Sequence, residues 1–284
     1  MERVRSPAVA GQFYPADPEK LRQKLAQCYR HPLGPGRLPE GSPQALDQAF
    51  GYIVPHAGYD YSGPVAAHAF GCMARLGRPR VVALLGPNHH GLGQPLALSP
   101  WEQWSTPLGT LPVETTLACR LAELMPGLVP DAAAHRHEHS LEVLLPFLVH
   151  LYGPSIAILP LVVADQSLAV AQLLGEALAS IVGEGGMVVL ASSDFSHYLA
   201  DPSARREDSY ALQAIQALDA TALARVVRER GLNMCGPGPV MALLVAFRAM
   251  GAASARLLAY ATSGDTSGDR TSVVGYAAVE VHAR

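Results

Sequence analysis

Three segments combine histidines with glycine, proline or serine directly after short apolar runs. They read Pro-His-Ala-Gly-Tyr, with His56; Gly-Pro-Asn-His-His-Gly, with His89 and His90; and Ser-Ser-Asp-Phe-Ser-His, with Asp194 and His197. Imidazole and carboxylate groups bind metals and exchange protons near neutral pH. Neighbouring glycines let a backbone approach a ligand closely. A lone loop histidine is usually structural, but this whole set favours a functional site.

Cys235 lies in an Asn-Met-Cys-Gly-Pro-Gly-Pro segment just before a predicted helix. A thiol at a helix N-terminus has a lowered pKa, and the thiolate binds metals or attacks electrophiles. A buried cysteine in a tight turn is the alternative. Imidazoles with a thiolate suit iron, copper or zinc, and leave positions open for a substrate or dioxygen. Asp194 and His197 would then orient groups or transfer protons.

A further histidine-rich run covers residues 135–142. It is predicted to open a helix over residues 138–150, which Pro146 bends or interrupts. His139 and Glu142 are three apart and can share a helix face, so spacing alone does not decide which faces a pocket. For two histidines of this run we favour a solvated helix start over a functional role: His135 and His137.

Short apolar runs alternate with longer helical patterns along the chain. Strands are predicted at residues 50–54, 80–85, 155–163, 187–192, 255–261 and 272–281. Further helices are predicted at residues 65–76, 115–124, 168–182, 207–230 and 240–250. Within the strand at 155–163, Pro160 indicates a sheet edge or a bulge.

This alternation predicts an α/β fold with a mainly parallel central sheet that helices flank on both faces. The final two strands have no helix between them and can pair antiparallel. The proline- and glycine-rich segment 32–43 is interpreted as a loop, and no internal repeat is present, so one domain over residues 1–284 is expected. Ligands bind beyond the carboxyl ends of strands in open α/β sheets, which is where the three histidine segments should meet.

The composition argues against two classes of partner. The net charge is −3, charged residues make up 16%, and lysine occurs only at Lys20 and Lys24, so neither nucleic acid nor an acidic membrane is expected. Apolar runs are too short for a membrane helix and the N-terminus lacks a signal-peptide core, so a cytoplasmic location is predicted. The four cysteines form no CxxC pair. Three of them are expected to be small buried hydrophobes: Cys28, Cys72 and Cys119.

The motifs together resemble the Memo family, whose prokaryotic members are called AmmeMemoRadiSam system protein B. The resemblance covers nearly the whole chain, in order, and begins with the Ala-Val-Ala-Gly-Gln-Phe-Tyr-Pro opening at residues 8–15. It continues through the segments at 55–63, 86–90, 138–142 and 192–197, and ends with Cys235 and Gly236.

The resemblance implies a fold like that of the class III extradiol dioxygenases, which cleave catechol rings with non-haem iron. It implies that His56, His89 and Cys235 bind iron or copper. The same resemblance places Asp194 and His197 close by, and His139 near the pocket: these three are our candidate catalytic residues. The dioxygenases use a carboxylate as third ligand, and a thiolate there changes the redox behaviour of the metal. Catechol cleavage itself is therefore not implied.

We favour two hypotheses for the function. The first is an oxidoreductase that uses Fe(II), or else copper or zinc, with dioxygen on a small aromatic substrate. The second is a non-catalytic metal- or peptide-binding protein that keeps the dioxygenase-like fold. A metallohydrolase is disfavoured because two-metal sites need bridging carboxylates, and a serine hydrolase because no GxSxG elbow is present. The family name also implies an AMMECR-type protein and a radical S-adenosylmethionine enzyme as partners.

Overall fold

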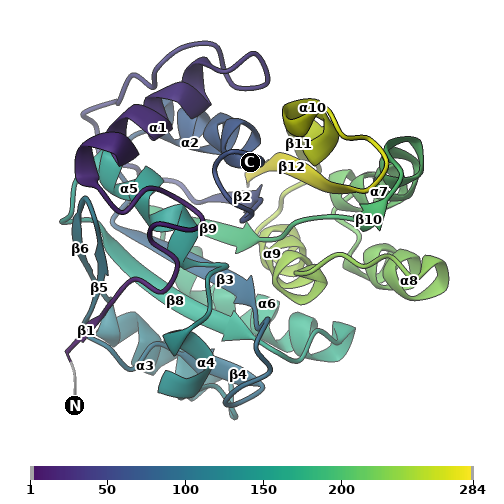
Figure 1. Ribbon diagram of the computed structural model, residues 1–284. Helices are drawn as coiled ribbons and strands as arrows, with labels where there is room; N and C mark the ends of the chain where they lie inside the picture. The colour runs from purple at the N-terminus through teal and green to yellow at the C-terminus, as the bar shows by residue number, and fades with distance from the viewer. Residues whose placement is uncertain (1–2, 283–284) are drawn as a thin grey trace.

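Four parallel strands form the centre of the main sheet in the computed structural model, which describes residues 3–282 (Figure 1). Their order is β2 (Phe50–Val54), β9 (Met187–Ser192), β3 (Val81–Pro87) and β8 (Ala157–Val163). These strands are almost wholly buried and rich in Val, Leu and Ile, as is typical of parallel strands covered on both faces. The predicted parallel core is confirmed.

Shorter or antiparallel strands complete the sheet on both sides. Beyond β2 lies antiparallel β12 (Val273–His282), which pairs antiparallel with both β11 (Ala255–Thr262) and β10 (His197–Leu199). Beyond β8 lie antiparallel β4 (Leu96–Leu98) and then β7 (Val129–Pro130). A separate small sheet contains β1 (Val4–Arg5), β5 (Gln103–Thr106) and β6 (Gly109–Pro112). The antiparallel pairing predicted for the last two long strands is confirmed.

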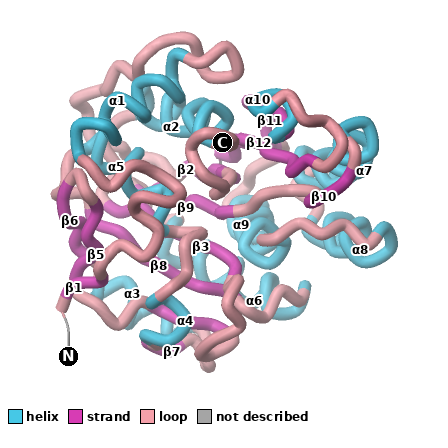
Figure 2. The backbone as a smooth tube through the Cα atoms, in the orientation of Figure 1, coloured by secondary structure: helices cyan, strands magenta, loops and turns pink. Residues whose placement is uncertain are grey.

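Helices cover both faces of the sheet, as Figures 1 and 2 show. Alternate strand residues separate into two hydrophobic clusters: Val82 and Leu84 belong to one, and Ala83 and Leu85 to the other. The first is closed by α1 (Pro18–Arg30), α2 (Gly63–Leu76) and α5 (Leu145–Tyr152). The second is closed by α3 (Thr115–Leu124), α6 (Leu168–Val182), α7 (Asp201–Gln216), α8 (Ala220–Arg230) and α9 (Pro237–Ala249). Among residues 3–282, no helix has both the length and the apolar character needed to cross a bilayer.

The predicted start of the helix over residues 138–150 is wrong. A short helix, α4 (Ala132–Arg136), is followed by residues 137–141 in irregular conformation, a 3-10 turn, η1 (Glu142–Leu144), and only then α5. Pro146 explains the late start, because a proline fits the first turn of a helix but not its interior. His139 and Glu142 therefore do not share a helix face.

Pro160 forms no bulge, but it does lie at the point where β8 loses its pairing on one side. On the other side, Pro160 pairs in regular register with Leu84 of β3. Its carbonyl accepts from the Ser99 N–H (3.2 Å) on the β4 side, where the strand pairing ends at Leu161. The missing N–H of Pro160 points to that same side, so no bond to β3 is lost.

Two expectations about exposure also fail. His135 is fully buried: its Nε2 lies 3.1 Å from the Ala97 carbonyl oxygen, and its ring packs edge-on against Trp104. His137 is exposed, as expected. Cys28 and Cys72 are buried, but Cys119 is exposed because α3 turns a different stripe, with Leu117, toward the sheet.

The free energy of unfolding of the metal-free chain should fall as the pH drops from about 6.5 toward 4, in part through His135. Burial lowers the pKa of His135 to about 4. Between that value and the unfolded pKa of about 6.5, the unfolded chain binds a proton that the folded chain does not, so acid favours unfolding. At pH 5 this histidine alone accounts for about 2 kcal/mol, measurable by urea unfolding at pH 7 and pH 5.

The matched variants are His135→Gln, which removes the titrating group, and His137→Gln at an exposed position. The pH-dependent loss should shrink only in His135→Gln. The same loss in both variants would contradict the burial of a neutral His135.

Candidate metal centre

The three histidine segments meet at one edge of the sheet because they follow three adjacent parallel strands. Residues 55–59 follow β2, residues 193–197 follow β9, and residues 88–91 follow β3. Val54 pairs with Ser192, and Leu85 with Ala191, so the strands end almost level. The convergence that the sequence predicts is present.

His56 is fixed in orientation by a chain of two hydroxyl-mediated contacts. Its Nδ1 lies 2.7 Å from Ser192 Oγ, which donates its own proton to the Ser140 carbonyl oxygen at 2.7 Å. Ser192 Oγ must then accept from His56, so the ring carries its proton on Nδ1. The unprotonated Nε2 faces Cys235 Sγ at 3.1 Å. The backbone N–H of His56 donates to Asp194 Oδ1 at 2.8 Å.

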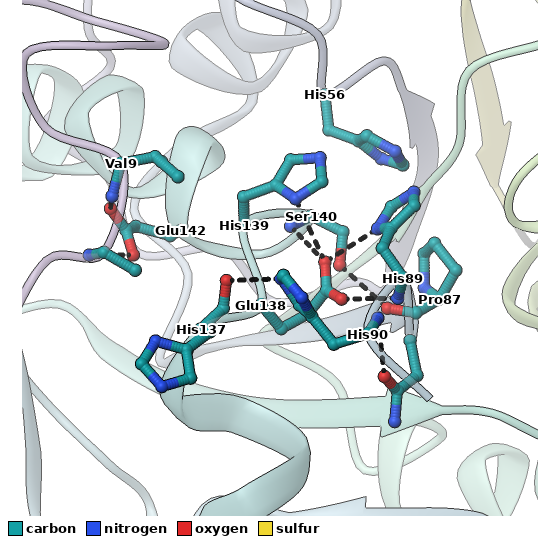
Figure 3. Close-up of polar contacts among 12 residues, drawn as sticks. Val9, His56, Pro87, His89, His90, His137, Glu138, His139, Ser140 and Glu142 are labelled. Atoms are coloured by element: carbon teal, nitrogen blue, oxygen red, sulfur yellow. Dashed lines mark hydrogen bonds and ion pairs between the residues drawn. The ribbon is translucent and has the colours of Figure 1, made fainter. Parts of the chain in front are cut away.

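Glu138 orients a second imidazole in the same way (Figure 3). Its Oε1 lies 2.8 Å from His89 Nδ1 and accepts from the Ser140 N–H at 2.8 Å, while its Oε2 accepts from the His89 N–H at 2.6 Å. Burial by itself would raise the pKa of Glu138, but its hydrogen bonds with the His89 side chain and the Ser140 N–H hold it well below its usual range. His89 therefore carries its proton on Nδ1 and leaves Nε2 free.

His139 completes a group of three imidazoles. Figure 3 shows its ring facing those of His56 and His89, and one ligand nitrogen from each lies within 4.8 Å of the other two. The ring centroids are 4.4 Å apart for His89 and His139 and 5.5 Å apart for His56 and His139. Burial lowers the pKa of His139 to about 4 and that of His56 well below its usual value, so both imidazoles are neutral near pH 7.

Cys235 forms a second group with His56 and Asp194, again within 4.8 Å of one another. Its Sγ accepts from the Asp194 N–H at 3.0 Å. The expected lowering of its pKa is wrong: burial and the adjacent Asp194 raise the pKa of this thiol well above its usual value. Cys235 lies just before the first turn of α9, where the helix dipole favours the thiolate. Desolvation of the buried thiol has the larger effect on its pKa. Burial likewise raises the pKa of Asp194 to about 6.

The predicted ligands are thus distributed over two overlapping groups. His56 belongs to both, whereas His89 lies with His139 and Cys235 lies with Asp194. The alternative histidine, His90, is exposed and falls in a third group, with Glu138 and His139.

His197 lies outside these groups, at the start of β10. Its Nδ1 is 3.0 Å from the Asn233 carbonyl oxygen, which can only accept, so Nδ1 carries the proton. The Asn233 side chain also accepts from the His197 N–H and donates to its carbonyl. A protonated His197 would oppose the rise of the Asp194 pKa that burial causes, so His197 can act on the site although it lies outside these groups.

Several residues of the site were not singled out from the sequence. Ser192, Ser140 and Glu138 orient the imidazoles, and Asn233 holds His197. Glu142, which was considered as a pocket residue, instead accepts from Arg5, Tyr14 and the backbone N–H groups of residues 8 and 9. Only the position of Glu138 next to His139 offered a signal, because a carboxylate commonly accompanies a ligand histidine.

Known proteins resemble this chain over nearly its whole length. A family described as "Memo-like protein" matches residues 5–280. "MEMO1 family protein MK0963" of Methanopyrus kandleri is 46% identical over 279 residues, covering 97% of this chain and 98% of that protein. A "MEMO1 family protein" of Ignicoccus hospitalis is also 46% identical, with 98% of both covered.

A solved structure shares the fold at much lower sequence identity. It is the crystal structure of uncharacterized protein JW3007 from Escherichia coli K12, with a TM-score of 0.55 and 15% identity. The match covers 82% of this chain and 99% of that chain.

Replacing Glu138 by Gln should weaken binding of a divalent ion about 10- to 100-fold, the usual effect of losing a carboxylate that orients a ligand histidine. The carboxamide of this variant has one accepting oxygen and a nitrogen that can only donate, so one of the two bonds to the ring and the backbone N–H of His89 is lost. Anaerobic titration with Co(II) measures the change, with Glu123→Gln as an exposed control. Equal affinities in wild type and Glu138→Gln would show that Glu138 does not prepare the site.

Proposed function

The chain belongs to the Memo family, and from this premise we propose that it is a metal-dependent oxidoreductase acting on a small, aromatic substrate. The metal is Fe(II), with copper or zinc as the alternatives, and its ligands are His56, His89 and Cys235. One observation carries the proposal. The Nδ1–H groups of His56 and His89 donate hydrogen bonds to Ser192 and Glu138, so each ring presents an unprotonated Nε2 to the site.

The donor set supports this choice of metals. Imidazole nitrogens with one thiol and one carboxylate suit iron, copper and zinc, whereas magnesium and calcium prefer oxygen. Three protein ligands leave positions open for a substrate. His139 and Asp194 stand beside the same pocket, so each could serve as a further ligand or as an acid–base group.

When bound, a redox-active ion supplies electron transfer and polarises substrate oxygens. Side chains of the protein would then accept and release the protons of the reaction. His197 donates Nδ1–H to Asn233 and keeps Nε2 free to accept a proton. Asp194, with its pKa raised to about 6 by burial, is held by the His56 N–H and can retain or release a proton near neutral pH.

The second candidate is a binding protein without turnover, and Tyr198 favours it. This residue is 78% exposed and has a φ of 61°, beside His197. A bulky residue in left-handed backbone costs about 1–3 kcal/mol, which is commonly retained where the side chain contacts a ligand or partner. For either candidate, a cytoplasmic location and partnership with an AMMECR-type protein and a radical S-adenosylmethionine enzyme are further proposals.

Elemental analysis after anaerobic purification tests the metal assignment. Wild type should contain roughly one iron or copper per chain, and Cys235→Ser should lose most of it because a hydroxyl is a poor substitute for thiolate. Cys119→Ser, at an exposed cysteine outside the site, should keep wild-type content. Unchanged metal in Cys235→Ser would exclude Cys235 as a ligand.

His197→Ala separates catalysis from binding. This variant should retain the metal, since His197 lies outside the ligand groups, but lose at least about 100-fold in dioxygen consumption with an active aromatic substrate. His137→Ala, at an exposed histidine, is the control. Equal turnover in His197→Ala would remove that residue from the mechanism. Metal retention without any dioxygen consumption in wild type would favour the binding protein.

A further inference from the structure

Gln166 connects the fourth parallel strand to the cysteine of the site. It lies three residues beyond the end of β8, at the same sheet edge as the histidine segments. Its Nε2 donates to the Cys235 carbonyl oxygen at 3.0 Å, and its Oε1 accepts from the Gly238 N–H at 2.7 Å. One carboxamide therefore holds both ends of the turn that carries the thiol.

The opposite side of this turn is held by the segment that follows β9. The Cys235 N–H donates to the Asp194 carbonyl (3.2 Å), and the Gly236 N–H donates to Ser193 Oγ (3.0 Å). The packing is close: a Cβ on Gly236 would lie 2.4 Å from the Ser192 carbonyl oxygen, and one on Gly238 would lie 2.9 Å from Gln166 Oε1. The turn is thus clamped between two strand ends and has little freedom to shift.

Gln166 has two separable roles. Gly236, the N-cap of α9, has no side chain to cap the helix, and Gln166 Oε1 supplies the missing acceptor to the Gly238 N–H. That bond stabilises the helix. The second bond, from Nε2 to the Cys235 carbonyl, does nothing for the helix cap and instead fixes the residue whose Sγ stands 3.1 Å from His56 Nε2.

We propose that Gln166 is a positioning residue for the Cys235 thiol, acting through the backbone of the 235–238 turn. This inference rests on the proposed function, because it takes Cys235 to be a metal ligand. Removing the Nε2–carbonyl bond releases the turn on the α6 side, so the thiol samples positions that do not match the imidazoles. Such loss of orientation weakens metal binding about 10- to 100-fold.

Two substitutions separate the roles. Gln166→Leu removes both bonds. Gln166→Glu keeps an acceptor for the Gly238 N–H but turns an oxygen toward the Cys235 carbonyl, so the cap survives and the positioning bond does not. Gln172→Leu, at an exposed glutamine on α6, is the matched control.

The probe is Co(II), titrated anaerobically, with its affinity and its thiolate-to-cobalt charge-transfer absorption as readouts. Both Gln166 variants should bind Co(II) at least about tenfold more weakly with a changed charge-transfer band, while Gln172→Leu matches wild type. Thermal unfolding of the metal-free chains should show that Gln166→Glu loses less stability than Gln166→Leu, because it keeps the cap bond to the Gly238 N–H. If Gln166→Glu bound Co(II) with wild-type affinity and showed the wild-type charge-transfer band, Gln166 would serve only as a helix cap and the proposal would be overturned.

A metal-independent readout distinguishes failure of this inference from failure of the proposed function. Iodoacetamide modification of Cys235 in the metal-free protein, read by mass spectrometry, should change severalfold in rate in both Gln166 variants and not in Gln172→Leu. If wild type binds no Co(II), the proposed function fails, and this rate alone decides the role of Gln166. Unchanged rates of Cys235 modification in the two Gln166 variants would overturn the positioning role of Gln166.

Discussion

The parallel pairing of β2, β9 and β3 is the constraint on which the site depends. Because these strands run in the same direction and end almost level, the residues that follow them are brought to one edge of the sheet. A slip of one residue in this register would turn every strand side chain to the opposite face. Ser192, which orients His56 from inside β9, would then point away from the pocket. The alternation of buried side chains that forms the two hydrophobic clusters therefore also fixes the positions of these histidine segments.

Burial then creates a second requirement, which hydrogen bonds meet. A desolvated imidazole must be neutral and must still have a partner for its N–H. Ser192 and Glu138 are those partners, and each leaves the inner nitrogen unprotonated. Glu138 is itself buried, and its charge is balanced by N–H donors from His89 and Ser140. The irregular backbone at residues 137–141 lets the adjacent Glu138 and His139 both face the site, whereas adjacent residues of a helix point in different directions.

The N-terminal segment is attached to the same region by a buried ion pair. Arg5 donates to Glu142 at 2.7 Å, and Glu142 also accepts from the Tyr14 hydroxyl and from the Val9 N–H, the last shown in Figure 3. These bonds explain why Glu142 is structural although its spacing from His139 suggested a pocket role. They also carry the N-terminal chain over the site, where Phe13 contacts the His139 ring with centroids 4.6 Å apart.

The sequence by itself determined the alternating architecture and the segments that carry the site. Apolar periodicity is local, so it predicted the strand at 50–54 and the helix at 115–124 with their observed bounds. Only the tertiary structure decided what each polar side chain does. The partners of His56 and His89 lie 136 and 49 residues away in the chain, and no local pattern encodes such pairings. Burial of His135 and the raised pKa of Cys235 have the same origin: both depend on desolvation by distant segments that pack over them.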